Sequence, residues 1–185
     1  MPILTAVLDA NVLFPASLRD TLLRAVEENL YEALWSDQIL DEAIRNLVAT
    51  NRITPQGAGY LNAQLKAAFP SAFVNGYDAL IPALDCDEKD RHVLAAAIHG
   101  EAHVIVTFNL RHFPIRSLAP YGIEAQHPDV FLTRLYAADA DALARIVKDQ
   151  AAGMSKSSVT PMQVLDTLAQ HAPRFVALVR PSVVR

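Results

Sequence analysis

The chain has 185 residues, of which 52% are hydrophobic and 19% are charged, with a formal net charge of −4 at pH 7. This composition is typical of a globular protein and argues against a disordered chain. One cysteine, Cys86, excludes an internal disulfide and a cysteine-ligated zinc site. The negative net charge excludes a global basic field for nucleic acid, so a polyanionic substrate would need local arginines or bound cations. We expect no transmembrane segment, no secretory signal and a cytoplasmic location.

Strand and helix patterns alternate over the first 126 residues. Residues 3–8 form an apolar run rich in β-branched side chains, which is typical of a buried strand, and this run ends at Asp9. The same criteria predict three further strands, at residues 33–35, 103–107 and 123–125. They also predict four helices, at residues 17–30, 37–50, 54–69 and 85–99. Such alternation predicts an α/β fold in which helices cover a parallel sheet.

The chain from Pro128 onward has no strand pattern and instead carries apolar residues at helical spacing. We therefore predict two domains, an α/β domain over residues 1–126 and a helical C-terminal extension over residues 127–185. Residues 153–158 have the composition of a linker. We interpret the helices after this linker as a mobile end that docks on a partner, and the earlier part of the extension as packing on the core.

Polar residues fall where a parallel sheet would gather them. Asp9 ends the first strand, and Asn109 follows the third strand. Glu42 lies in the second helix. Asp90 lies in the first turn of a later helix, with Asp87 one turn earlier. Carboxyl ends of parallel strands meet at one edge of a sheet, where ligands bind. Neighbouring carboxylates repel one another unless a cation lies between them. An oxygen-only ligand set suits Mg²⁺ or Mn²⁺.

Each of these acids also has a simpler interpretation. Asp9 could cap the following turn, and Asp87 and Asp90 are favoured at the start of any helix by the helix dipole. Glu42 could pair with Arg45 on the protein surface. The spacing of the residues leaves the metal site and these structural roles both open.

Four segments, taken in order, resemble the PIN-domain nucleases. They are Val-Leu-Asp-Ala-Asn-Val-Leu (7–13), Ile-Leu-Asp-Glu-Ala-Ile-Arg-Asn-Leu (39–47), Asp-Arg-His-Val-Leu-Ala-Ala-Ala (90–97) and Val-Ile-Val-Thr-Phe-Asn-Leu-Arg-His-Phe (104–113). The ordered set carries the resemblance, which covers roughly residues 3–126. It is most similar to the bacterial branch of the family that includes VapC-type toxins.

The resemblance implies a PIN-like α/β/α sandwich with a central parallel sheet, and a Mg²⁺- or Mn²⁺-dependent endoribonuclease in which the metal activates water. It maps the three metal-ligating acids of the family onto Asp9, Glu42 and Asp90, and its flanking polar positions onto Asn11 and Thr107. The α/β domain would then be the nuclease domain. The resemblance also implies a structured RNA substrate such as tRNA and a role as the toxin of a type II toxin–antitoxin pair, neutralised by a small antitoxin. A homodimer is compatible with it.

The sequence departs from the family pattern at the fourth catalytic position. Many PIN nucleases have an aspartate where Asn109 stands, and His112 stands where some relatives have another acid. An amide lacks the charge to hold a second cation strongly, so we expect one firmly bound metal ion. Asp87 or a substrate phosphate could support a second.

Two arginines are candidates for contacts with RNA. Arg19 and Arg111 each follow a strand-end motif and are expected to contact phosphates, although ordinary surface charge explains each of them as well.

The alternative function is a PIN-fold RNA-binding or scaffold module in which Asn109 has weakened or abolished catalysis. A phosphohydrolase with Asp9 as nucleophile is disfavoured, because that chemistry usually uses a second acid two residues on, where Asn11 stands.

Overall fold

The computed structural model describes residues 3–153 and 159–184, and the chain divides into two compact units. The first unit contains Met1–Phe14 and Glu32–Gln126, and the second contains Pro15–Tyr31 and His127–Arg185. The chain therefore leaves the first unit after Phe14, forms one helix of the second unit, and returns. The predicted domains, 1–126 and 127–185, differ from these units in the placement of residues 15–31.

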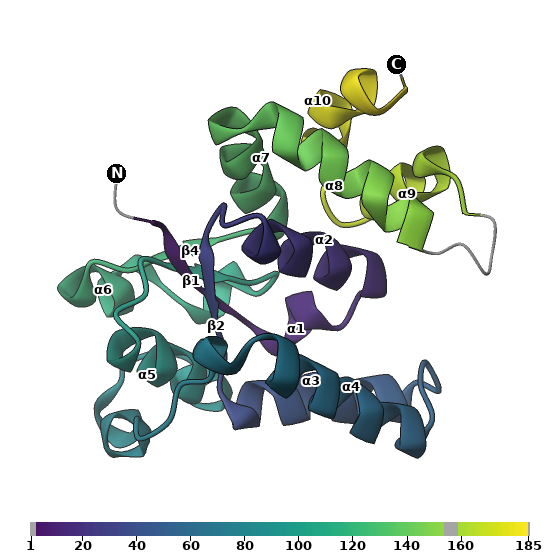
Figure 1. Cartoon of the computed structure of the whole chain (residues 1–185). Helices are drawn as coiled ribbons and strands as arrows, with labels where there is room; N and C mark the ends of the chain where they lie inside the picture. The colour runs from purple at the N-terminus through teal and green to yellow at the C-terminus, as the bar shows by residue number, and fades with distance from the viewer. Residues whose placement is uncertain (1–2, 154–158, 185) are drawn as a thin grey trace. The chain divides into compact units, whose positions relative to one another are not determined.

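The first unit is built on a four-stranded sheet with the order β2-β1-β3-β4, in which every pairing is parallel (Figure 1). Its strands are β1 (Thr5–Leu8), β2 (Glu32–Leu34), β3 (Val104–Val106) and β4 (Glu124–Gln126). This arrangement confirms the predicted α/β fold with a central parallel sheet. Leu8 of β1 pairs with Val106 of β3. The residues that follow these two strands, Asp9 and Thr107, consequently leave the sheet at the same edge.

Short helices connect the strands of the first unit. The α-helices are α1 (Ala10–Leu13), α3 (Asp37–Ala49), α4 (Pro55–Ala68), α5 (Arg91–His99) and α6 (Ile115–Leu118). The 3₁₀ turns are η1 (Pro70–Ala72), η2 (Asp78–Ala83), η3 (Glu88–Asp90), η4 (Leu110–His112) and η5 (Ala119–Tyr121). Ser36 and Thr54 are the N-caps of α3 and α4, since Ser36 Oγ accepts a hydrogen bond from Ile39 N–H and Thr54 Oγ1 accepts one from Gly57 N–H.

Helix α5 lies against the two central strands, β1 and β3, and this packing positions Asp90 at its start. Residues 93–97, which are Val-Leu-Ala-Ala-Ala, are fully buried, and the three alanines allow the helix to approach the sheet closely. The helix ends at Gly100, where a Cβ atom would lie 2.6 Å from Leu34 Cδ1. A side chain at this position would therefore force the Leu34 side chain to move.

The second unit is a bundle of helices: α2 (Ala16–Glu27), α7 (Pro128–Ala138), α8 (Ala140–Gly153), α9 (Pro161–Leu168) and α10 (Pro173–Val184). Buried Thr21, Gln150 and Asp129 in it are hydrogen-bonded through their side chains. Gln150 accepts a hydrogen bond from Thr21 Oγ1 at 2.8 Å and donates one to Ser17 O at 3.0 Å. Asp129 Oδ1 accepts one from Phe175 N–H at 2.9 Å. In the part of the chain that the structure describes, no helix is long and apolar enough to cross a membrane.

The last two helices belong to the core of the second unit, which differs from the mobile end that the sequence suggested. Helix α10 packs on α7 and α8, and α9 packs on α8. Leu165, Leu168, Phe175 and Val179 are fully buried. The apolar stripes are therefore covered by the chain itself. Residue 153 of the expected linker is the last residue of α8, and residues 154–158 lie outside the described part of the chain.

Candidate active site

Asp9 directly follows β1 and is almost completely buried, with 3% of its surface exposed. Its N–H donates a hydrogen bond to Val106 O at 3.1 Å, which continues the pairing of β1 with β3 by one residue. Asp9 occupies the N-cap position of α1, but its side chain makes no capping hydrogen bond. The carboxylate is therefore directed elsewhere, and the simpler interpretation of Asp9 as a side-chain cap is wrong.

Neutral donors hold the Asp9 carboxylate in one orientation. Asn11 Nδ2 and Thr107 Oγ1 each donate a hydrogen bond to Asp9 Oδ2 at 2.6 Å. Thr107 Oγ1 also accepts hydrogen bonds from Asn11 Nδ2 and from Asn109 N–H, both at 3.0 Å. Asn11 Oδ1 accepts a further hydrogen bond from Phe108 N–H at 3.1 Å. The loops after β1 and β3 are thus joined by a polar network, and Asp9 lies at its centre.

The charges of three acids act on one another at this edge of the sheet. Burial raises the pKa of Asp9 to about 6; the Thr107 hydrogen bond opposes this rise, and the negative charges of Asp90 and Glu42 add to it. Burial also raises the pKa of Glu42, with a further contribution from Asp90. The structure therefore brings together the three carboxylates that the sequence grouped, and it gives them the mutual repulsion that a cation would relieve.

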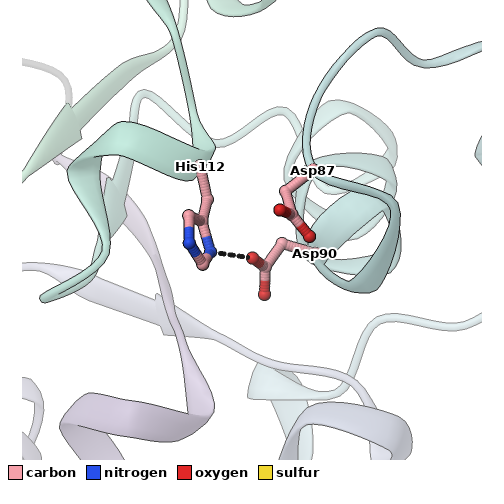
Figure 2. A group of neighbouring side chains, drawn as sticks. All are labelled: Asp87, Asp90 and His112. Atoms are coloured by element: carbon pink, nitrogen blue, oxygen red, sulfur yellow. Dashed lines mark hydrogen bonds and ion pairs between the residues drawn. The ribbon is translucent and has the colours of Figure 1, made fainter.

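A second group of side chains includes Asp90 and comes from two 3₁₀ turns, η3 and η4. Asp90 Oδ2 lies 2.6 Å from His112 Nδ1, and Asp87, Asp90 and His112 each offer a ligand atom within 4.8 Å of the others (Figure 2). The backbone fixes this arrangement, because Asp87 N–H donates to His112 O at 3.2 Å. Asp87 Oδ1 accepts a hydrogen bond from Lys89 N–H at 3.1 Å.

His92 lies close to Glu42. Its side chain is buried, and burial lowers its pKa, which favours a neutral imidazole at pH 7. His92 Nε2 is 3.7 Å from Glu42 Oε2, which is too long for a hydrogen bond. We conclude that His92 is a buried, neutral neighbour of Glu42 and does not pair strongly with it.

The structure separates the two arginines that the sequence treated alike. Arg111 is exposed on η4, next to the acidic residues, and its Nε donates a hydrogen bond to His112 Nε2 at 3.3 Å. Arg19 lies on α2 and belongs to the second unit, where burial lowers the pKa of its guanidinium. Only Arg111 shares a unit with the carboxylates.

The sequence places His112 where some relatives have another acid, but it does not indicate that His112 contacts Asp90. Its contact with Asp90 joins residues 22 positions apart, and no spacing rule predicts which way a side chain in a 3₁₀ turn points. A usable signal was its position close after a strand whose end already carried Thr107 and Asn109. Polar residues in the first turn after such a strand end are candidates for the same site.

The residues at this edge of the sheet fit a divalent cation. Asp9, Glu42 and Asp90 supply carboxylate oxygens, and the side-chain donors to Asp9, Asn11 and Thr107, are uncharged. Burial raises the pKa of Asp9, and the negative charges of Asp90 and Glu42 add to a rise that a bound cation would offset. Hard oxygen donors of this kind suit Mg²⁺ or Mn²⁺.

Comparison with known proteins identifies the family. A family model described as PIN domain matches residues 5–111, more than half of the chain, and the chain belongs to this family. A second model, described as VapC50 C-terminal domain, matches residues 128–181. These matches confirm the resemblance noted in the sequence.

One curated protein shows the relationship directly. The chain is 42% identical over 110 residues to "Putative ribonuclease VapC50" of Mycobacterium tuberculosis (strain ATCC 25618 / H37Rv). The aligned segment covers 60% of this chain and 65% of that protein, which is less than two thirds of its length. No solved structure matches the chain.

Proposed function

We propose that this protein is a Mg²⁺- or Mn²⁺-dependent endoribonuclease and the toxin of a type II toxin–antitoxin pair. The observation that carries the proposal is the buried carboxylate of Asp9, held by neutral donors within electrostatic range of Asp90 and Glu42. The membership of the PIN domain family and the name of the M. tuberculosis relative support ribonuclease chemistry on this site.

In this proposal Asp9, Glu42 and Asp90 hold the metal ion. When bound, a divalent cation lowers the pKa of water and offsets negative charge on the phosphodiester. Asn11 and Thr107 keep Asp9 Oδ2 in place, so that the ligand need not be ordered when substrate arrives. Burial of Asp9 excludes water and strengthens every electrostatic interaction of its carboxylate.

The substrate contacts in the proposal come from the loop after β3. Asn109 is anchored by its backbone hydrogen bond to Thr107, and its side-chain amide can donate to a phosphate oxygen. Arg111 is exposed beside it and supplies a positive charge for the RNA backbone. Arg19 is proposed as a further phosphate contact, and Asp87 as a supporting acid.

The wider biological setting belongs to the same proposal. The substrate would be structured RNA such as tRNA, and the protein would be cytoplasmic. A small antitoxin protein would inhibit it. A homodimer is compatible with this proposal. We assign the nuclease to residues 1–126 and a helical extension to residues 127–185, which the VapC50 C-terminal domain model matches in part. The competing candidate is an RNA-binding or scaffold module without catalysis, favoured by Asn109 in place of an acid.

Mapping RNA ends in a bacterium that expresses the chain tests this function. We expect induction of the wild-type chain to slow growth and to create new RNA ends at a few positions in structured RNAs. Asp90→Asn removes one proposed metal ligand and should produce neither effect. Identical RNA ends in the two strains, at equal protein levels, would favour the RNA-binding module.

A further inference from the structure

His112 has no role in the proposed chemistry, although its imidazole meets the acidic site. The ring points at Asp90, and Asp87 lies beside the pair (Figure 2). The side chains of Asp90 and His112 are largely buried, with 13% and 23% exposed, so neither is an ordinary surface residue. A neutral imidazole nitrogen is among the commonest metal ligands in proteins.

The separations in this group are compatible with one ion. Ligand atoms on opposite sides of an ion with bonds of about 2.1 Å lie about 4.2 Å apart. The ligand atoms of Asp87, Asp90 and His112 lie within 4.8 Å of one another, and His112 Nδ1 and Asp90 Oδ2, which are 2.6 Å apart, must separate to bind one ion.

We propose that His112 is a metal ligand which, with Asp87 and Asp90, adds a nitrogen donor to the metal centre and shifts its preference from Mg²⁺ toward ions such as Co²⁺, Ni²⁺ or Zn²⁺. The inference rests on the proposed function, because Asp90 belongs to both sets of ligands. Carboxylate oxygens alone favour Mg²⁺, Ca²⁺ or Mn²⁺, whereas imidazole favours the later transition metals.

Binding through Nδ1 requires two local changes. The proton that lies between His112 Nδ1 and Asp90 Oδ2 moves through solvent to His112 Nε2, which frees Nδ1 and Oδ2 to bind the ion. His112 Nε2 then carries the ring proton, so Arg111 Nε gives up its 3.3 Å hydrogen bond to this atom. Arg111 is exposed and free to rotate into solvent. Asp87 Oδ1 is occupied by Lys89 N–H, which leaves Oδ2 for the ion.

Metal titration of the full chain after chelator treatment tests the role of His112 without any RNA. Heat of binding would be measured for Co²⁺ and Mg²⁺, and the visible absorption of Co²⁺ would report nitrogen ligation. The variants are His112→Gln and His112→Asp, with His99→Gln as a control at an exposed histidine on α5. Circular dichroism would establish that each variant is folded.

We expect His112→Gln to weaken Co²⁺ binding by about tenfold or more, to change the Co²⁺ spectrum, and to leave Mg²⁺ binding within about twofold. His112→Asp should bring the two affinities closer together, and His99→Gln should change neither. Glutamine can still donate a hydrogen bond to Asp90, so unchanged Co²⁺ binding in His112→Gln would mean that His112 only positions Asp90 and would overturn the proposal. Wild-type protein that binds no Co²⁺ would also overturn it.

The metal titration can distinguish a failure of the His112 ligand assignment from a failure of the ribonuclease proposal. If the wild-type chain cleaves no RNA with any metal while Co²⁺ binding depends on His112, the ribonuclease proposal fails and the ligand assignment holds. If the chain cleaves RNA with Mg²⁺ and His112→Gln leaves Co²⁺ binding unchanged, the ribonuclease proposal holds and the ligand assignment fails.

Discussion

Replacing Asp9 with asparagine is expected to lower RNA cleavage by at least about 100-fold and, in metal-free buffer at neutral pH, to make the fold more stable. Cleavage falls because the variant loses a charged oxygen ligand at the centre of the site. Stability rises because asparagine can still accept the hydrogen bonds of Asn11 and Thr107 but carries no charge that burial penalises or that Asp90 and Glu42 repel.

The pH dependence of this stabilisation follows from the raised pKa. The carboxyl of Asp9 has a pKa of about 6 in the folded chain and an ordinary value of 3.8, which corresponds to about 3 kcal/mol between its protonation states. Asp9 therefore contributes this stability fully below pH 3.8 and loses it as the pH rises through 6. Asparagine does not titrate, so the advantage of Asp9→Asn should be largest above pH 6 and should shrink toward pH 4.

Urea unfolding at pH 4.5, 5.5 and 7.5 in the presence of a chelator measures the free energy of unfolding for this comparison. Asp78→Asn, at an exposed position in η2, is the matched control and should alter neither stability nor cleavage. An Asp9→Asn variant that cleaves RNA at the wild-type rate would remove Asp9 from the metal site. If Asp9→Asn were less stable than the wild type at every pH, the hydrogen bonds of the Asp9 carboxylate would stabilise the fold by more than its buried charge destabilises it.

Deleting the chain after Gly153 is expected to leave an insoluble or partly unfolded protein. The deletion removes α9 and α10, whose buried side chains are Val164, Leu165, Leu168, Phe175, Val176, Val179 and Val183. Burying each large apolar side chain contributes about 1.5–3 kcal/mol, so the loss of all seven is comparable with the 5–15 kcal/mol that typically stabilises a whole domain. The newly exposed apolar faces of α7 and α8 would also favour aggregation.

Two point variants on α10 give a milder version of the same test. Phe175 is fully buried and packs edge-to-face with Tyr136, whereas Leu178 is 45% exposed. Phe175→Ala should lower the free energy of unfolding by about 3–5 kcal/mol, and Leu178→Ala should change it little. A soluble, folded truncation, together with equal stabilities for the two variants, would restore the interpretation of these helices as a detachable partner-binding end.

The local patterns of this sequence are strong enough to predict the sheet and three of its acids. The apolar runs before Asp9 and Asn109 could only be buried strands, and parallel pairing then places their ends at one edge. Ser36 and Thr54 are N-caps that act within three residues, so the sequence alone shows them. These features depend on neighbours that are close along the chain or on the topology of parallel sheets.

Other features depend on contacts between distant residues, which one sequence does not record. The amphipathic helix α2 needs a partner for its apolar face, and nothing in its own residues shows that this partner is the C-terminal bundle. The same holds for α9 and α10, whose stripes fit a partner protein as well as their own chain. The contact of His112 with Asp90 depends on the direction of one side chain in a 3₁₀ turn.

The metal requirement of RNA cleavage tests the central claim most directly. Purified wild-type chain and Asp90→Asn would be incubated with RNA in Mn²⁺, in chelator, and in chelator followed by excess Mn²⁺. We expect cleavage by the wild type in Mn²⁺, none in chelator, recovery after Mn²⁺ is restored, and no cleavage by Asp90→Asn in any condition. Cleavage that persists in chelator, or equal cleavage by the two proteins, would contradict it.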